Sequence, residues 1–166
     1  GSVEPVRDES MQRACQLIGK TNQFNLTTRR HSPSDVQNML AMRGSIGLTL
    51  SLKDKFGDYG ITGVLLAVPV DAGSSSGMTL RIDTLLMSCR IINRTAEDFF
   101  FDRFLAICQA QAVSRLMAEY CPTSKNALVK DLLPHLGFTE TGSDESGTRY
   151  EMTLPTPAPK HFIRPA

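Results

Sequence analysis

The residues best suited to chemistry are 88–94, SCRIINR, which we expect to form a turn between a strand and a helix. A turn that leads into a helix N-terminus presents free backbone N–H groups and the positive end of the helix dipole. Arg90 and Arg94 add guanidinium groups, which bind phosphate well. The turn is therefore a candidate phosphate site. The alternative is that both arginines are ordinary surface charges, because Glu97 and Asp98 already use the same dipole.

The strand before this turn is expected over residues 78–87. Met78, Leu80 and Ile82 alternate with polar residues, which is typical of a half-buried strand. From Leu85 onward the apolar residues are consecutive. Either the strand becomes buried on both faces, or a bulge at residues 83–84 changes its register. A bulge would leave backbone groups available to a ligand.

The helix after the turn is expected to be long, from about residue 95 to 120. Apolar residues recur there at three- and four-residue steps, at Phe101, Leu105, Cys108, Ala112 and Leu116. This spacing predicts an apolar stripe wide enough to pack on a sheet.

The composition indicates one folded domain whose net charge is close to zero. At 166 residues and 41% hydrophobic content, the chain is long enough for a substantial core. A formal net charge of +1 argues against nucleic acid or an anionic membrane as a bulk partner. Any anion must therefore be bound by a local cluster of cations.

The four cysteines, Cys15, Cys89, Cys108 and Cys121, form no CxxC pair and no metal-ligand spacing with the histidines. We expect free thiols in a reducing cytoplasm and no metal site. The longest strongly apolar run, residues 63–70, is too short to cross a bilayer, and the N-terminus lacks the pattern of a signal peptide.

The two ends of the chain have the composition of flanking segments. Residues 1–6 begin with a Gly-Ser that resembles a cloning remnant, and residues 155–166 contain the proline-rich string PTPAP. We expect a folded domain over residues 7–154, excised from a longer polypeptide.

The remaining patterns predict an α+β (mixed α/β) domain with helices packed on a largely antiparallel sheet. Helices are expected at 8–20, 33–42 and 128–136, and strands at 46–52, 61–70, 138–141 and 148–154. The run at 20–30, KTNQFNLTTRR, has only two large apolar residues. It is either a solvated loop or a polar surface whose side chains are held by one another and by a ligand.

The order of elements, with a central strand followed by an arginine-bearing turn and a helix, resembles the GNAT acyltransferase fold. In that family, a Q/R-x-x-G-x-G/A pattern in this turn holds the pyrophosphate of coenzyme A. Residues 90–95 here read RIINRT, so Arg90 matches while Asn93 and Thr95 replace the glycines. Their side chains crowd the close backbone approach that glycine permits, which argues against ordinary coenzyme A binding.

Longer strings resemble the C-terminal half of FkbH-like proteins. They are KTNQFNLTTR from residue 20, FGDYG from 56, IDTLLMSCR from 82 and TSKN from 123, and the similarity extends over roughly residues 13–138. FkbH-like proteins join a HAD-type phosphatase half to a GNAT-like half. They load a three-carbon unit, derived from a phosphorylated glycolytic intermediate, onto the phosphopantetheine thiol of an acyl carrier protein in polyketide biosynthesis.

This resemblance implies an acyltransferase that acts on an acyl carrier protein, with phosphopantetheine as the carrier's prosthetic group. A neighbouring polyketide synthase or HAD-type phosphatase domain is a further expected partner. The DxDxT motif of the phosphatase half is absent, so we do not expect this chain to perform dephosphorylation.

Within this resemblance, Cys89 is the candidate covalent acyl carrier. It follows a strand, is adjacent to Arg90 and precedes a helix N-terminus, surroundings that favour the nucleophilic thiolate. The alternative is a small buried hydrophobic residue. Asp83 is a candidate to accept the incoming thiol's proton or hold a substrate hydroxyl. Pairing of Asp83 with Arg81 or Lys125 is the alternative.

Two further groups of candidates bind ligand in this interpretation. A small polyol needs many converging hydrogen bonds, for which the candidates are Lys20, Asn22, Gln23, Asn25 and Arg30. The candidates for binding phosphopantetheine are Arg90, Asn93, Arg94, Lys125 and Asn126. The histidines, His31, His135 and His161, lie outside the matched strings and are poor candidates.

Three functions remain open on the sequence. The domain transfers a glyceryl or related short acyl unit to a carrier thiol, or it only binds the carrier and its phosphopantetheine arm. The third possibility is a conventional acetyl-CoA-dependent N-acetyltransferase.

Overall fold

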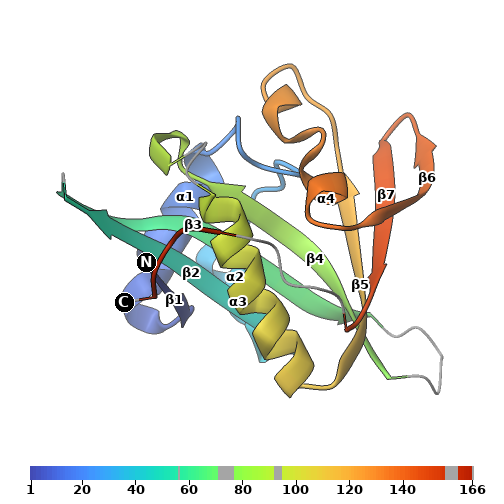
Figure 1. The fold of residues 1–166 in the computed structure, drawn as a ribbon, viewed down its shortest axis with the longest axis horizontal. Helices are drawn as coiled ribbons and strands as arrows, with labels where there is room; N and C mark the ends of the chain where they lie inside the picture. Colours follow the sequence, from blue (N-terminus) through green and yellow to red (C-terminus); the bar gives the residue numbers. More distant parts are fainter. Residues whose placement is uncertain (56, 71–76, 92–94, 156–160, 166) are drawn as a thin grey trace.

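Seven strands form one mixed sheet in the order β1-β2-β3-β4-β5-β7-β6 (Figure 1). The computed structural model describes residues 1–55, 57–70, 77–91, 95–155 and 161–165. The strands are β1 (Ser2–Pro5), β2 (Ile46–Asp54), β3 (Gly57–Val70), β4 (Met78–Met87), β5 (Val113–Tyr120), β6 (Thr139–Asp144) and β7 (Gly147–Thr153). Neighbouring strands are antiparallel except β4 and β5, which are parallel. The predicted α+β class with a largely antiparallel sheet is confirmed.

Helices cover both faces of this sheet. The helix α3 (Ala96–Ala110) lies on one face, while α1 (Asp8–Lys20) and α2 (Pro33–Ala41) lie on the other (Figure 1). The main core contains four phenylalanines of α3, and a second core joins α1 and α2 to β3. The short helix α4 (Leu132–His135) connects β5 to the β6–β7 hairpin. No helix among the described residues is long and apolar enough to cross a membrane.

The long helix predicted over residues 95–120 is wrong in its second half. The helix α3 ends at Ala110, and Val113–Tyr120 forms β5. Leu116 lies four residues after Ala112, a step that fits both the helical repeat and the two-residue repeat of a strand. The turn is at Ala112, whose φ of 55° takes the chain out of the helix.

The sequence left two alternatives for β4, and both are present: residues 85–87 are all buried, and the strand has a bulge. Thr84 pairs with Leu66 and Ile82 pairs with Ala67, so the register skips Asp83. The backbone carbonyl at the bulge is not left for a ligand, because Thr27 Oγ1 donates to the Asp83 oxygen at 3.1 Å. The segment before α2 is therefore fixed to the middle of the sheet.

The flanking segments contact the sheet and its main helix. Residues 2–5 form β1, which pairs with residues 48–51 of β2, although the sequence predicts a cloning remnant and linker there. At the other end, the His161 ring packs against Phe99 of α3 with their centroids 5.1 Å apart. Residues 2–5 form a strand because they pair with β2, and their own sequence gives no sign of this pairing.

The strands β4 and β5 pair along only part of their length. Their parallel register extends to Arg81 on β4 and Met117 on β5. Residues 24–26, in the connection between α1 and α2, then lie between them and form an isolated bridge with β4 at Leu86. We call residues 24–26 the wedge.

Candidate functional site

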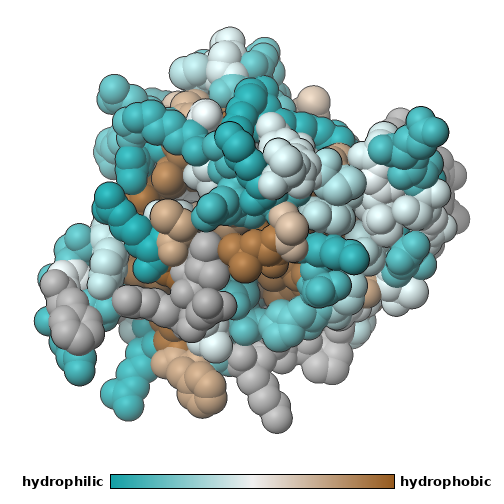
Figure 2. Space-filling model, turned by 90° about the horizontal axis from the view of Figure 1, so that it is seen from above, coloured by the Kyte–Doolittle hydropathy of each residue, from teal (hydrophilic) through white to brown (hydrophobic). Residues whose placement is uncertain are grey.

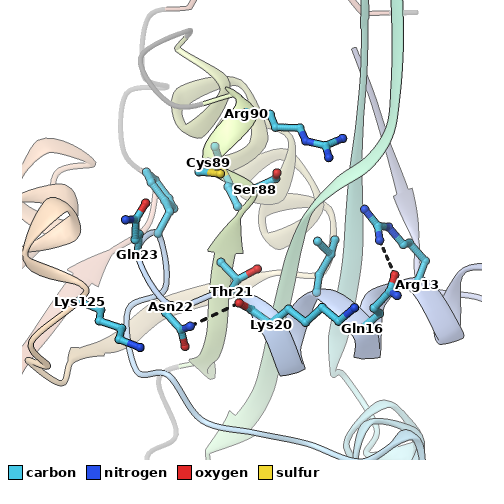
Figure 3. A pocket seen from close by; sticks show the side chains of 13 residues that line it. Arg13, Gln16, Lys20, Thr21, Asn22, Gln23, Ser88, Cys89, Arg90 and Lys125 are labelled. Carbon is cyan, nitrogen blue, oxygen red and sulfur yellow. Dashed lines mark hydrogen bonds between the residues drawn. The ribbon is translucent and has the colours of Figure 1, made fainter.

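A cleft of about 660 Å³ lies at the C-terminal end of β4 (Figure 3). Its walls come from α1, the connection after α1, the end of β4 with the turn that follows, and Lys125. The molecular face in Figure 2 carries mostly hydrophilic side chains, with hydrophobic ones visible in the hollows between them. The lining residues are Arg13, Gln16, Leu17, Lys20, Thr21, Asn22, Gln23, Phe24, Met87, Ser88, Cys89, Arg90 and Lys125.

The cleft is strongly cationic. Four of its lining residues carry positive charge, and none of the lining residues that the structure describes is acidic: the cations are Arg13, Lys20, Arg90 and Lys125. The Arg13 guanidinium donates to Gln16 Oε1. The Lys20, Arg90 and Lys125 side chains make no hydrogen bond or ion pair with a described residue. These groups can therefore bind an anion without breaking an internal ion pair.

The Cys89 side chain is exposed and lines this cleft. It opens the 3₁₀ turn Cys89–Ile91, directly after β4. Two backbone bonds hold the turn: Ser88 N donates to Thr62 O at 2.7 Å, and Ile91 N donates to Ser88 O at 3.2 Å. Ile91 is buried and anchors the turn in the core. The turn thus presents an exposed thiol beside Arg90, among the cationic side chains of the cleft (Figure 3).

The other three thiols are less exposed than Cys89. Burial raises the pKa of the Cys15 thiol, and burial raises the pKa of Cys108 to about 12. Burial also raises the pKa of Cys121, although the nearby Arg29 charge opposes this effect. None of the three lines the cleft. If one thiol of this chain carries an acyl group, the geometry favours Cys89.

The first part of the polar run lines the cleft. Lys20 and Gln23 are exposed there, and Asn22 is half-buried between them in the sequence. The Asn22 side chain accepts a hydrogen bond from the Arg30 guanidinium and donates to Lys20 O at 3.5 Å. Three of the five proposed substrate-binding residues are therefore brought together.

The other two, Asn25 and Arg30, are not among the cleft's lining residues. Asn25 is fully buried, donates to Thr21 O at 3.1 Å and accepts from Thr28 N at 3.0 Å. Arg30 donates to Ile18 O and to Thr21 O, so it binds carbonyl groups at the C-terminal end of α1. Both side chains use their hydrogen-bonding groups to fix the backbone.

The predicted phosphopantetheine-binding residues divide in the same way. Arg90 and Lys125 line the cleft, whereas Asn126 is fully buried. The Asn126 side chain accepts from Thr123 N at 2.7 Å and donates to Asn25 O at 3.0 Å and Cys121 O at 2.9 Å. Its role in this structure is to join the wedge to the end of β5. The predicted residues Asn93 and Arg94 lie outside the described residues.

Asp83 is remote from the Cys89 thiol. It lies on β4 four residues before Met87, and a strand rises about 3.3 Å per residue, so the end of β4 is about 13 Å away. The carboxylate pairs with Arg81 at 3.2 Å, which is the alternative recognised in the sequence. Because direct proton transfer requires hydrogen-bond reach, this distance argues against transfer between Asp83 and the Cys89 sulfur.

Asp83 instead holds a buried ionic cluster, and its side chain is only 6% exposed. Its carboxylate also lies 3.3 Å from Arg29 Nη1 and 2.6 Å from His31 Nε2. Burial alone would raise the pKa of Asp83, but hydrogen bonds from His31 and Thr84 and the charges of His31 and Arg29 lower it below its usual value.

Sequence reasoning missed Arg29, Glu119 and His31 as members of this cluster, and it had set aside His31 as a poor candidate. His31 is separated from Asp83 by 52 residues, and its only sequence signal is its place directly after the polar run. Arg29 extends the cluster to β5, where Nη2 donates to Glu119 Oε2 at 2.6 Å. The cluster therefore ties the connection after the wedge to both β4 and β5.

Comparison with known proteins identifies the architecture. No protein-family model matches the sequence, and no curated protein does either. Solved structures do match: the GNAT domain of S. lividans PAT is 16% identical, with a TM-score of 0.68 over 92% of this chain and 89% of that one. An acetyltransferase of the GNAT family from Streptococcus pneumoniae is 11% identical, with a TM-score of 0.69 over 93% and 99%. This chain has the GNAT fold.

A third similar structure is Rv2747 from Mycobacterium tuberculosis, in complex with CoA and NLQ. It is 11% identical, with a TM-score of 0.65 over 93% of this chain and 100% of that one. At these identities the similarity establishes the fold alone. The closer resemblance to FkbH-like proteins stays a prediction.

Proposed function

We propose that this GNAT-fold domain transfers a glyceryl or related short acyl group, by way of Cys89, to the phosphopantetheine thiol of an acyl carrier protein. The observation that carries the proposal is that an exposed thiol and four cationic residues line one cleft, with no acidic residue among its described lining residues. The thiol supplies the nucleophile, and the cations suit the phosphodiester of the carrier's arm.

The resemblance to FkbH-like proteins supports the same cleft. Parts of three matched strings, far apart in the sequence, line it: residues 20–24, residues 87–90 and Lys125. The fourth string, residues 56–60, contributes no lining residue. Convergence of separate strings on one cleft is expected when they bind a common ligand.

The proposed chemistry is an exchange between thioesters. The Cys89 sulfur attacks the carbonyl carbon of an acyl thioester, a new C–S bond forms, and the bond to the donor's sulfur breaks. The carrier's thiol then attacks the acyl-Cys89 carbonyl and releases the Cys89 sulfur. Each step exchanges one C–S bond for another, and the proton lost by the attacking thiol returns to the leaving sulfur.

Recognition of the two parts of the substrate is assigned to two groups of cleft residues. Lys20, Asn22 and Gln23 are proposed to bind the hydroxyl groups of the acyl unit. Arg90 and Lys125 are proposed to bind the phosphodiester, with Asn93 and Arg94 assigned to it from the sequence alone. In the proposed pathway, a HAD-type phosphatase or polyketide synthase domain acts beside this one.

Intact-protein mass spectrometry tests the covalent step. The purified chain is incubated with the glyceryl thioester of phosphopantetheine, and we expect one glyceryl group on Cys89, located by peptide mapping. The Cys15→Ala variant should gain the same adduct, and Cys89→Ala should gain none. Absence of an adduct from the native chain, with the thioester still intact, would contradict the covalent role.

The GNAT fold also keeps a second candidate open, a conventional acetyl-CoA-dependent N-acetyltransferase. The observation in its favour is that similar structures include acetyltransferases of the GNAT family. Titration calorimetry separates the two: tight binding of acetyl-CoA without acylation of Cys89 would support the N-acetyltransferase.

The third candidate is a module that only binds the carrier. If loading proceeds unchanged in Cys89→Ala while charge reversal at Arg90 weakens carrier binding, the chemistry occurs on another protein.

A further inference from the structure

The wedge fills the space where β4 and β5 diverge, and it does so with backbone hydrogen bonds to both sides. Leu26 N donates to Leu85 O at 3.3 Å, and Met87 N donates to Phe24 O at 3.0 Å. On the other side, Cys121 N donates to Leu26 O at 2.9 Å. The backbone groups that an extended ligand would need between the strands are therefore already used by the chain itself.

The wedge is also packed and locked. Its three residues are at most 5% exposed. Asn126 Nδ2 donates both to Asn25 O and to Cys121 O, so one buried amide joins the wedge to the segment after β5. Displacing the wedge would leave these buried polar groups without partners, which is costly.

The cavities on the two sides of the wedge are separate. A cavity of about 180 Å³ is lined by Arg29, Glu119, Cys121 and residues 146–149, and it shares no lining residue with the cleft at Cys89. The cleft's volume of about 660 Å³ lies within the range of roughly 300–1,000 Å³ for pockets that hold one small ligand. The cleft therefore suits one thiol-bearing arm, with no continuation past the wedge toward the second cavity.

We infer that the acyl donor and the acyl acceptor enter this one cleft in turn, and that each excludes the other while it is bound. The wedge fills the space between β4 and β5, so a second arm has no room between these strands. The acyl group must then remain on Cys89 while the arms are exchanged. This inference rests on the proposed acyl transfer and deepens it, because it fixes the order in which the substrates bind.

The two half-reactions follow from this order. The donor thioester loses its acyl group to the Cys89 sulfur, the free donor thiol leaves, and the acceptor thiol enters. Attack by the acceptor restores the Cys89 thiol. The proton lost by each attacking sulfur is taken up by the departing one, so no oxidant or reductant is required.

Steady-state kinetics test the inference with the glyceryl thioester of phosphopantetheine as donor and a phosphopantetheinylated acyl carrier protein as acceptor. With both concentrations varied, we expect parallel double-reciprocal lines. At a saturating concentration of the other substrate, the S-methyl thioether of phosphopantetheine, which cannot carry an acyl group, should inhibit competitively against each substrate. Intersecting lines, or noncompetitive inhibition against either substrate while the other is saturating, would overturn the single shared cleft.

An equilibrium measurement isolates binding from chemistry. In Cys89→Ala, or Cys89→Ser if the alanine variant does not fold, the donor's apparent Kd should rise in proportion to the thioether concentration. A donor Kd that does not change with bound thioether would overturn the inference.

The mass measurement on Cys89 distinguishes the two proposals. An adduct together with intersecting lines removes only the shared cleft, whereas no adduct removes the proposed function.

Discussion

The polar run from Lys20 to Arg30 contains two regions with similar residues and different roles. Lys20 and Gln23 line the cleft and make no side-chain hydrogen bond with a described residue. Asn25 and Arg30, a few residues later, use their side chains to bind backbone groups of the fold. The same contrast separates Lys125 from Asn126. Binding capacity thus depends on which polar groups the fold leaves unsatisfied, because a saturated side chain has none to offer a ligand.

The largest expected effect comes from the thiol of the cleft. Cys89→Ala should reduce acyl transfer by about 10³-fold or more, as loss of a nucleophile does in other covalent enzymes. The rate is measured by the gain of the acyl mass on the carrier. Cys15→Ala, a thiol outside the cleft, is the matched control and should retain the native rate. Equal rates in both variants would place the chemistry elsewhere.

The second prediction compares Asn126, which is buried in the fold, with the adjacent Lys125, which lines the cleft. Asn126→Ala should lower the free energy of unfolding by about 2–4 kcal/mol, because it leaves buried hydrogen-bonding groups without partners. Lys125→Ala should change it by less than about 0.5 kcal/mol, since its side chain is exposed. Urea denaturation measures both. Similar losses of unfolding free energy in the two variants would contradict the assignment of Asn126 to the fold and Lys125 to the cleft.

The third effect concerns the ionic cluster. Asp83→Asn should destabilise the fold by about 2–3 kcal/mol, because it leaves Arg29, His31 and Arg81 facing one another without their shared carboxylate. The partners are partly exposed, which keeps the loss below that of a fully buried pair. Asp144→Asn, in an exposed ion pair with Arg149, is the control and should leave the denaturation midpoint nearly unchanged.

The same carboxylate predicts a pH dependence. The pKa of Asp83 is lowered in the folded chain, so the unfolded chain binds its proton at higher pH. The stabilisation is therefore complete above the ordinary aspartate pKa of about 4 and is lost as the pH falls through the lowered folded value. Urea denaturation at a series of acidic pH values should show a shallower loss in Asp83→Asn than in the native chain. Identical slopes would contradict this assignment.

The smallest effect is on affinity. Arg90→Glu or Lys125→Glu should each weaken binding of phosphopantetheine by about 0.5–1 kcal/mol, roughly two- to fivefold, because exposed charges are screened by solvent. The effect should decrease with added salt. Lys130→Glu lies outside the cleft and serves as the control for net charge. An equal loss in Lys130→Glu would indicate a nonspecific charge effect.

Local sequence patterns predicted much of the fold. The two-residue alternation identified β2 and β4, a more continuously apolar run identified β3, and serine followed by proline identified the start of α2. The pattern failed at β5, where Leu116 satisfies both the helical and the strand repeat. Choosing between these repeats requires the neighbouring strands, which the local sequence does not reveal.

The candidate site was predictable to a smaller extent. The turn at Cys89 and Arg90 could be found, because a strand end followed by a helix start is a local signal. The partners of Asp83 and Asn126 could not, since His31 and Asn25 lie 52 and 101 residues away in the sequence. Polar side chains with such distant partners look identical in the sequence to side chains that await a ligand.

The lock between Asn25 and Asn126 also has a consequence for how the molecule is made. Contacts between residues 101 positions apart form late, because a long loop must close before they contribute. A ribosome that has completed the turn after β4 has already produced Cys89, but not Asn126, which fastens the wedge. The nascent polypeptide therefore carries its thiol before the surrounding cleft can be assembled.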